Sequence, residues 1–177
     1  MKKTILKHCH RPVQLLPAFL CPVGLLRTGF SRTISKKVKF LNNCSYEIDP
    51  KKQGDWNKLF GVCFGITGIH HNSIRFGWRY NNTDDVIELC VITYNNGEHK
   101  MDHIKGEDVR LNQYVNLSLT FTVNPDGDVT ADFSVNGRTV RTVYMGVIAE
   151  MFYFGCGLYF GGKTRAPHKM QVEWEKI

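Results

Sequence analysis

Apolar and polar residues alternate with a period of two along most of the chain. In the segment 115–123, Val, Leu, Leu, Phe and Val occupy the odd positions, while Asn, Ser, Thr and Thr occupy the even ones. Such alternation predicts a strand with one buried face, because successive side chains of a strand point to opposite faces. Met170, Val172 and Trp174 alternate with polar residues in the same way. The segment 86–94 is apolar at most positions, which is typical of a strand covered on both faces.

The residues between these segments are typical of tight turns. Asn96-Gly97 and Asn136-Gly137 tolerate the positive φ angles that two-residue hairpins require, and 124–127 (Asn-Pro-Asp-Gly) favours a longer turn. We expect strands near 38–41, 45–49, 59–66, 73–80, 86–94, 98–104, 115–123, 129–135, 138–145, 152–160 and 169–176. No convincing helix separates them, although 147–151 could form a single turn. The pattern predicts an all-β fold: a two-sheet antiparallel β-sandwich of jelly-roll type over residues 37–177.

The first 36 residues differ from the rest of the chain. Residues 1–50 contain nine Lys and Arg against two acidic residues, whereas 51–177 contain fourteen of each sign, so the net charge of +7 is N-terminal. This distribution argues against nucleic-acid binding through the folded domain. Residues 1–36 are interpreted as a basic and apolar arm that docks on another subunit, as a secretion signal, or as the product of a misassigned start site. The apolar part, 13–26, is too short to span a bilayer.

The cysteines indicate neither a disulfide framework nor a zinc site. The six cysteines form no Cys-x-x-Cys pair, and Cys63, Cys90 and Cys156 lie within apolar runs. We expect these three to be buried, reduced thiols that pack as small hydrophobic residues. This favours a reducing compartment, and a virion or cytoplasmic location is preferred to a secreted one.

Two segments carry a resemblance to known proteins. The hairpin 132–143 (DFSVNGRTVRTV) and the glycine-rich aromatic segment 153–162 resemble those of concanavalin A-like and laminin-G-like jelly rolls, over about residues 38–177. The run DWNKLFG…NSIRFGWRYN also resembles uncharacterised proteins of gut Bacteroidetes and their phages. The concanavalin-like resemblance implies glycan binding or glycoside hydrolysis. It also implies a Ca²⁺ at a sheet edge, for which Asp126 and Asp128 are candidates, although a simple Asp-Gly turn is the preferred interpretation of these residues.

The glycosidase motif that this resemblance implies is incomplete. Retaining hydrolysis needs two carboxylates on one face of a strand. Glu47-Ile48-Asp49 matches the first part of a Glu-x-Asp-x-x-Glu pattern, but Pro50, Lys51 and Lys52 follow and no second glutamate does. The sequence also lacks a nucleophile elbow and a phosphate-binding loop. We therefore expect no enzymatic activity and no cofactor.

The segment 75–82 (RFGWRYNN) raises the question of a binding surface. If it is a strand, Phe76, Trp78 and Tyr80 share one face, while Arg75 and Arg79 share the other across a glycine. The aromatic set is interpreted as core. The arginine face is either a solvated surface or a shallow groove for carboxylates or sulfates of an acidic sugar. In the reverse arrangement, the aromatic rings and the following asparagines would contact a sugar.

A second candidate site lies where two loops should meet. Antiparallel pairing of 73–80 with 86–94 brings the start of one strand beside the end of the other. This predicts one cluster of His70, His71, Asn72, Tyr94, Asn95 and Asn96. The histidine pairs are expected to be solvated loop residues, not metal ligands. The sequence predicts a non-catalytic recognition module with a glycan ligand. The alternatives are a structural subunit of a virion or cell-surface assembly and, third, a glycoside hydrolase.

Overall fold

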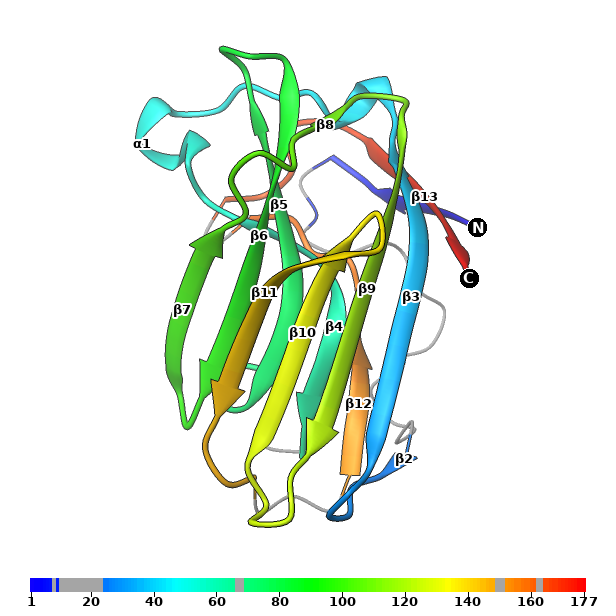
Figure 1. Cartoon of the computed structure of the whole chain (residues 1–177). Helices are drawn as coiled ribbons and strands as arrows, with labels where there is room; N and C mark the ends of the chain where they lie inside the picture. Colours follow the sequence, from blue (N-terminus) through cyan, green and yellow to red (C-terminus); the bar gives the residue numbers. More distant parts are fainter. Residues whose placement is uncertain (8, 10–23, 66–68, 149–151, 162–163) are drawn as a thin grey trace.

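Two antiparallel sheets face each other in the computed structural model, which describes residues 1–7, 9, 24–65, 69–148, 152–161 and 164–177 (Figure 1). The six-stranded sheet contains β1 (Lys2–Ile5), β3 (Ser31–Phe40), β9 (Tyr114–Val123), β10 (Val129–Val135), β11 (Arg138–Met145) and β13 (Met170–Lys176). Their order across the sheet is β1-β13-β3-β9-β10-β11. Strands β9, β10 and β11 follow one another as a meander, whereas β13 inserts between the two N-terminal strands.

The seven-stranded sheet and the loops between its strands carry the candidate site residues. It contains β2 (Gly24–Leu25), β4 (Asn57–Phe64), β5 (Ser73–Asn81), β6 (Val86–Asn95), β7 (Glu98–His103), β8 (Val109–Arg110) and β12 (Phe152–Cys156). The order is β2-β12-β4-β5-β6-β7, and β8 pairs with β6. Asn96 and Gly97, at φ angles of 50° and 87°, make the predicted tight turn between β6 and β7.

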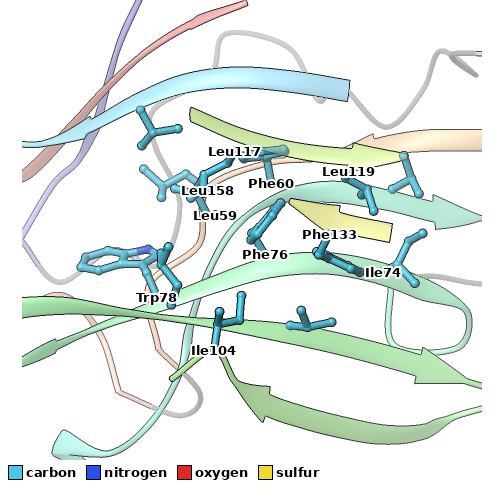
Figure 2. Packing of buried hydrophobic residues seen from close by; sticks show 14 of the residues in the cluster. Leu59, Phe60, Ile74, Phe76, Trp78, Ile104, Leu117, Leu119, Phe133 and Leu158 are labelled. Atoms are coloured by element: carbon cyan, nitrogen blue, oxygen red, sulfur yellow. The ribbon is translucent and has the colours of Figure 1, made fainter. Parts of the chain in front are cut away.

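The hydrophobic core fills the space between the two sheets (Figure 2). Aromatic rings from the two sheets meet edge to face: Phe76 lies 4.9 Å from Phe133, and Phe64 lies 5.5 Å from Phe121, between ring centroids. Trp78 is fully buried in this layer. The sequence interpretation of the aromatic stripe as core therefore holds, and the reverse arrangement, in which this ring faces a ligand, does not.

The predicted all-β sandwich is confirmed, with one strand missing and three added. No strand forms over 45–49, where a short 3-10 turn (Asn42–Cys44) and the helix α1 (Pro50–Gln53) bracket irregular chain. Pro50 starts the helix and Asp49 caps it, so the local signals favour a helix start over a strand end. Strands β1, β2 and β8 were not predicted because each has four residues or fewer. The helical turn considered at 147–151 falls partly outside the described residues.

Parts of the segment 1–36 belong to the sandwich. Strand β1 pairs with β13, and the α-ammonium group of Met1 donates a hydrogen bond to the carbonyl oxygen of Trp174 at 2.7 Å. Strand β3 begins at Ser31 and pairs with β9 from its first residue. A separate domain boundary at residue 36 and docking of the segment on another subunit remain predictions. Within the described parts of the chain, we find no helix with the length and apolarity needed to cross a bilayer.

Candidate functional site

The face of the seven-stranded sheet that points away from the core, here called the outer face, is buried to an unusual degree. Strand register places Lys58, Arg75, Arg79, Glu88 and Tyr94 on it, because their neighbours in sequence face the core. Lys58 is 6%, Arg75 2% and Glu88 9% exposed. Burying a charged group is costly unless the group is paired and hydrogen-bonded, and charged groups held in this way are often found at functional sites.

Two glycines let side chains lie flat against the sheet. A Cβ atom on Gly61 would collide with the carbonyl oxygen of Ile74 and lie 2.7 Å from Cγ of Arg75. A Cβ atom on Gly77 would lie 2.5 Å from Sγ of Cys90. The Arg75 side chain therefore crosses the space that a side chain at position 61 would fill. The glycines are needed for close packing on this face, not for an unusual φ angle.

Arg75 lies beneath the surface with part of its hydrogen-bonding capacity unused. Its Nη2 donates to the carbonyl oxygen of Ile69 at 3.4 Å, and its guanidinium carbon lies 5.2 Å from the ring centroid of Tyr94. The Nε atom is buried and has no hydrogen-bond partner among the described residues. A buried guanidinium without a carboxylate partner creates a positive potential at the surface above it.

Lys58 adds a second buried cation. Its ammonium group donates to the carbonyl oxygen of Trp56 at 3.1 Å and lies 5.8 Å from the ring centroid of Tyr159. Burial lowers the pKa of Lys58, and the charge of Arg75 lowers it further. The two cations thus repel each other, and an anion above them would relieve that repulsion.

A cluster of three rings lies beside Arg75 at one end of the sheet. The ring of His70 meets Tyr94 edge-on at 5.1 Å, and His99 stacks on Tyr94 at 5.5 Å with 25° between the ring planes. The backbone N–H of Asn96 donates to Oδ1 of Asn72 at 2.8 Å, which ties the two loops together. The structure therefore brings together the loops of the predicted cluster. Ligand binding by these residues remains a prediction.

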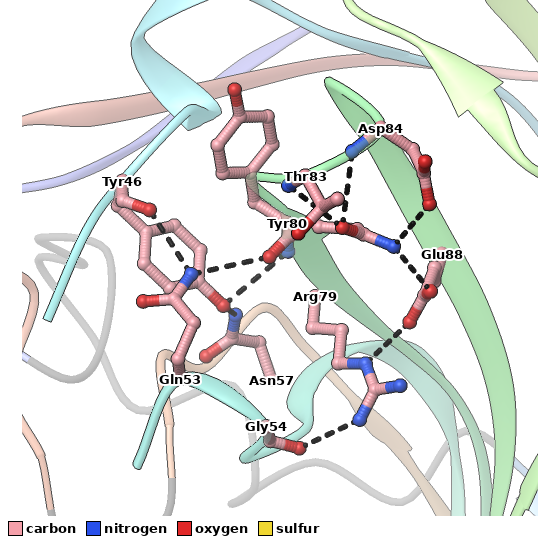
Figure 3. Close-up of polar contacts among 10 residues, drawn as sticks. Tyr46, Gln53, Gly54, Asn57, Arg79, Tyr80, Thr83, Asp84 and Glu88 are labelled. Atoms are coloured by element: carbon pink, nitrogen blue, oxygen red, sulfur yellow. Dashed lines mark hydrogen bonds and ion pairs between the residues drawn. The ribbon is translucent and has the colours of Figure 1, made fainter. Parts of the chain in front are cut away.

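The second predicted arginine is engaged within the protein (Figure 3). Arg79 donates through Nε to Glu88 at 2.5 Å and through Nη1 to the carbonyl oxygen of Gly54 at 3.0 Å. Its guanidinium group also lies 4.2 Å from the ring centroid of Trp56. Burial raises the pKa of Glu88, but hydrogen bonds from Arg79 and Asn81 outweigh burial, so the pKa is lowered overall. Arg75 and Arg79 share a face as predicted, yet Arg75, unlike Arg79, has no carboxylate partner among the residues that the structure describes.

Other candidate groups in the sequence have structural partners. Asp49 of the partial glycosidase motif accepts a hydrogen bond from the backbone N–H of Lys51 and caps α1. Asp128 accepts a hydrogen bond from the side chain of Asn124 at 2.5 Å within its turn. No group of three or more His, Cys, Asp or Glu side chains suited to a metal ion occurs among the residues that the structure describes.

Sequence reasoning did not identify Lys58, Tyr159 or His99 as part of the outer face. An isolated bridge pairs Lys58 with Tyr159, which is far away in the chain. The one available signal was the lysine itself, a lone charge within the otherwise largely apolar segment 57–64. Periodicity alone could not show which residue it would face.

The fold is similar to that of solved polysaccharide lyases. An Aly36B alginate lyase variant in complex with alginate tetrasaccharide gives a TM-score of 0.67 at 13% identity, over 99% of this chain and 78% of its own. Alginate lyase AlyC3 gives 0.56 at 12% identity, over 86% and 69%. An endo-β-1,4-glucuronan lyase from Trichoderma reesei gives 0.54 at 12% identity, over 85% and 68%. No family model and no curated protein matches the sequence.

These similarities contradict two expectations from the sequence: that the chain is a non-catalytic recognition module, and that it is not an enzyme. The similar proteins are enzymes that act on polysaccharides, and they are lyases. The missing second glutamate was a test for hydrolysis alone, so its absence does not argue against elimination chemistry. At these identities the similarity shows a β-sandwich jelly-roll fold, and any activity must be argued from this chain's own residues.

Proposed function

We propose that this protein is a polysaccharide lyase that cleaves a uronate-containing glycan by β-elimination on the outer face of the seven-stranded sheet. Two features support the proposal. Arg75 and Lys58 are buried cations without a carboxylate partner among the described residues, and the rings of Tyr94 and Tyr159 lie beside them. The sandwich is also of the kind found in alginate and glucuronan lyases. The resemblance of segments 132–143 and 153–162 to concanavalin-like jelly rolls is kept as part of this proposal.

β-Elimination from a uronate makes defined demands on a protein. The C5–H bond next to the carboxylate breaks, a double bond forms between C4 and C5, and the C4–O bond to the neighbouring sugar breaks. Negative charge builds up on the carboxylate as the proton leaves, so fixed positive charge near it lowers the barrier. A second group must accept the C5 proton, and the departing oxygen must receive one.

Arg75 and Lys58 are suited to neutralise the carboxylate. Both cations are largely removed from water, where their electrostatic effect on a bound anion is greater than at the surface. The unpartnered Nε of Arg75 adds a directional donor for a carboxylate oxygen. Arg79 is assigned no such part, because Glu88 and Gly54 occupy its donors.

Tyr94 is assigned the proton transfer. It is half-exposed, it lies beside the Arg75 guanidinium, and the rings of His70 and His99 hold it on two sides. Acting as the phenolate, its oxygen takes the C5 proton and becomes the phenol; the phenol then gives that proton to the departing oxygen, so the phenolate is regenerated in each cycle. The observation that carries the proposal is this contact between a buried, partly unpaired guanidinium and a half-exposed tyrosine.

The test measures the ultraviolet absorbance of unsaturated uronate ends released from alginate, glucuronan and neutral control polysaccharides. We expect release from at least one polyuronate and none from the neutral polymers. Tyr94→Phe keeps the ring contacts and should lower kcat by about 10²–10⁴-fold, the usual contribution of a positioned acid or base. Tyr144→Phe, a 76% exposed tyrosine on the other sheet, is the matched control. No release from any polyuronate, or equal kcat for Tyr94→Phe and the parent, would overturn the proposal.

A further inference from the structure

Cys63 and Cys156 lie on the outer face, on neighbouring strands β4 and β12. In the register of these strands, Phe154 pairs with Cys63 and Gly61 pairs with Cys156. The two cysteines are therefore diagonal neighbours on the same face. The residue opposite Cys156 has no side chain, which leaves room for the two sulfur atoms to meet. Cys63 is 5% exposed, and Cys156 is partly exposed.

Arg75 completes the surroundings of this pair. It lies opposite Gly61 on β5, so Cys156, Gly61 and Arg75 form one row across three strands. A hydrogen bond from the Cys156 thiol lowers the pKa of Cys63, and the positive charge of Arg75 lowers it further. The same hydrogen bond raises the pKa of Cys156. Cys63 is thus placed to be the thiolate and Cys156 the proton-bearing partner.

We propose that Cys63 and Cys156 form a dithiol that hydrogen peroxide or a related small peroxide oxidises reversibly to a disulfide. The inference rests on the two thiols, the register of β4 and β12 and the unpartnered Nε of Arg75. It does not depend on lyase activity. The pair is a modification site on the outer face, and its two redox states differ in the charge beside Arg75.

The reaction is balanced in two steps. The Cys63 thiolate attacks one peroxide oxygen: an S–O bond forms, the O–O bond breaks, and the departing hydroxide takes a proton to become water. The Cys156 thiol then attacks the sulfenic sulfur: the S–S bond forms, the S–O bond breaks, and a second water leaves with the thiol proton. In total, two thiols and one peroxide give one disulfide and two waters.

Closing the bond requires a small movement of β12. Diagonal neighbours in antiparallel strands have Cα atoms about 7–8 Å apart, whereas disulfides usually need at most about 6.8 Å. Strand β12 has five residues, and among the described strands its outer neighbour is β2, which has two. Such short pairing leaves β12 room to move, so the approach is feasible. The resulting bond would be strained and hence readily reduced.

The other buried cysteines provide internal controls. Burial raises the pKa of Cys44 to about 12, and its thiol donates to the carbonyl oxygen of Gln171 at 3.1 Å. Burial also raises the pKa of Cys90. Both side chains are fully buried. Because only thiolates react quickly with peroxide, these two should remain reduced while the pair oxidises.

The experiment treats the full-length folded protein with hydrogen peroxide, blocks the remaining thiols and digests with trypsin. Cleavage after Lys58, Arg75, Arg141 and Lys163 places the two cysteines on peptides 59–75 and 142–163. We expect mass spectrometry to show these peptides joined by a disulfide, with the joined form lost on adding dithiothreitol. Thiol loss at the pair should exceed that at Cys44 and Cys90 by about tenfold or more.

Single variants identify the attacking sulfur. Cys156→Ser should leave Cys63 as a sulfenic acid that dimedone traps, whereas Cys63→Ser should leave Cys156 largely unmodified. Cys44→Ser, with circular dichroism to check its fold, should still give the joined peptides. The proposal is overturned if the joined peptides are absent from oxidised wild type, or if Cys63 joins another cysteine instead. It is equally overturned if Cys156→Ser yields no dimedone adduct on Cys63.

Discussion

The outer faces of both sheets arise from the alternation of side chains along their strands, but the two faces carry very different chemical groups. On the six-stranded sheet, hydroxyl groups pair with one another across β3 and β9. Ser31 meets Thr122 at 3.0 Å, Thr33 meets Thr120 at 2.9 Å, and Ser35 meets Ser118 at 2.9 Å. On the seven-stranded sheet, Arg75 and Lys58 are buried and have no carboxylate partner within the described parts of the chain.

The two outer faces differ in how their polar groups are stabilised. Cross-strand hydroxyl pairs satisfy each other in a solvated layer, and each stabilises the sheet only slightly. Buried cations without acidic partners cost stability, so a fold that keeps them gains something else from them. The polar outer face of the six-stranded sheet is explained by solvation. The buried cations of the seven-stranded sheet are not explained by solvation, and the glycan proposed above would account for them.

The largest expected effect comes from filling the space that Arg75 crosses. Gly61→Ala would place a methyl group against the Ile74 carbonyl and Cγ of Arg75. We expect a loss of about 1–3 kcal/mol in the free energy of unfolding, as for other overpacked sites. Gly157→Ala is the control, since nothing lies within 4 Å of its Cβ position. Equal urea midpoints for the two variants would show that the flat packing over Gly61 is unimportant.

Next in size is the effect of pH through a lysine on the inner side of the sandwich. Lys36 lies 3.9 Å from the ring centroid of Trp174 and 4.7 Å from that of Phe60. Burial, followed by the charge of Lys3, lowers its pKa to about 8 from 10.5. The folded state therefore binds fewer protons than the unfolded state between these values, and stability should rise with pH across that window.

Lys36→Met should remove this pH dependence and raise stability at pH 7. The gain is at most about 3 kcal/mol from the pKa difference, less the ring–cation attraction that the variant loses. Thermal melts of the parent and the variant between pH 7 and 10 provide the measurement. A variant whose stability rises with pH as steeply as the parent's would assign the effect to another group.

A smaller effect is expected from replacing one cation by another on the outer face. Arg75→Lys keeps the charge but loses the fork and the Nε donor. We expect kcat/KM on a polyuronate to fall by about tenfold or more, since one good charge-assisted hydrogen bond is worth roughly 1.5–3 kcal/mol. Thr33→Ala on the other sheet should leave kcat/KM unchanged. Similar losses in both variants would remove the functional distinction between the faces.

The smallest change in stability is expected from the hydroxyl pairs between β3 and β9. Thr120→Ala removes one partner of an exposed pair, and surface substitutions of this kind change stability by about 0.5 kcal/mol or less. Chemical denaturation measures the change. A loss above about 1 kcal/mol would mean that the pairs support the sheet more than solvation implies.

The sequence predicted the fold and the face of the sheet on which Arg75 lies. Alternation in 115–123 and the Asn-Gly turns specify strands because they depend on local geometry alone. The placement of Arg75 and Trp78 on opposite faces of one strand followed from the same rule. Ion pairing of Arg79 with Glu88 depends on the register within the predicted hairpin, which alternation alone does not specify. The approach of Tyr159 to Lys58 depends on segments far apart in the chain, which no local pattern brings together. The engaged arginine could therefore not be told from the unpaired one.

Strand order also determines when the molecule can be completed during synthesis. The meanders β5-β6-β7 and β9-β10-β11 join strands that are adjacent in the chain and can pair early (Figure 1). Strand β13 lies between β1 and β3, so β1 and one edge of β3 have no partner strand until Met170–Lys176 is synthesised, although β3 can pair with β9 before then. The six-stranded sheet therefore cannot close until these residues have left the ribosome. Until then, the edge of β3 that faces β13 remains unpaired, and it is the part of the nascent protein that most needs protection by a chaperone.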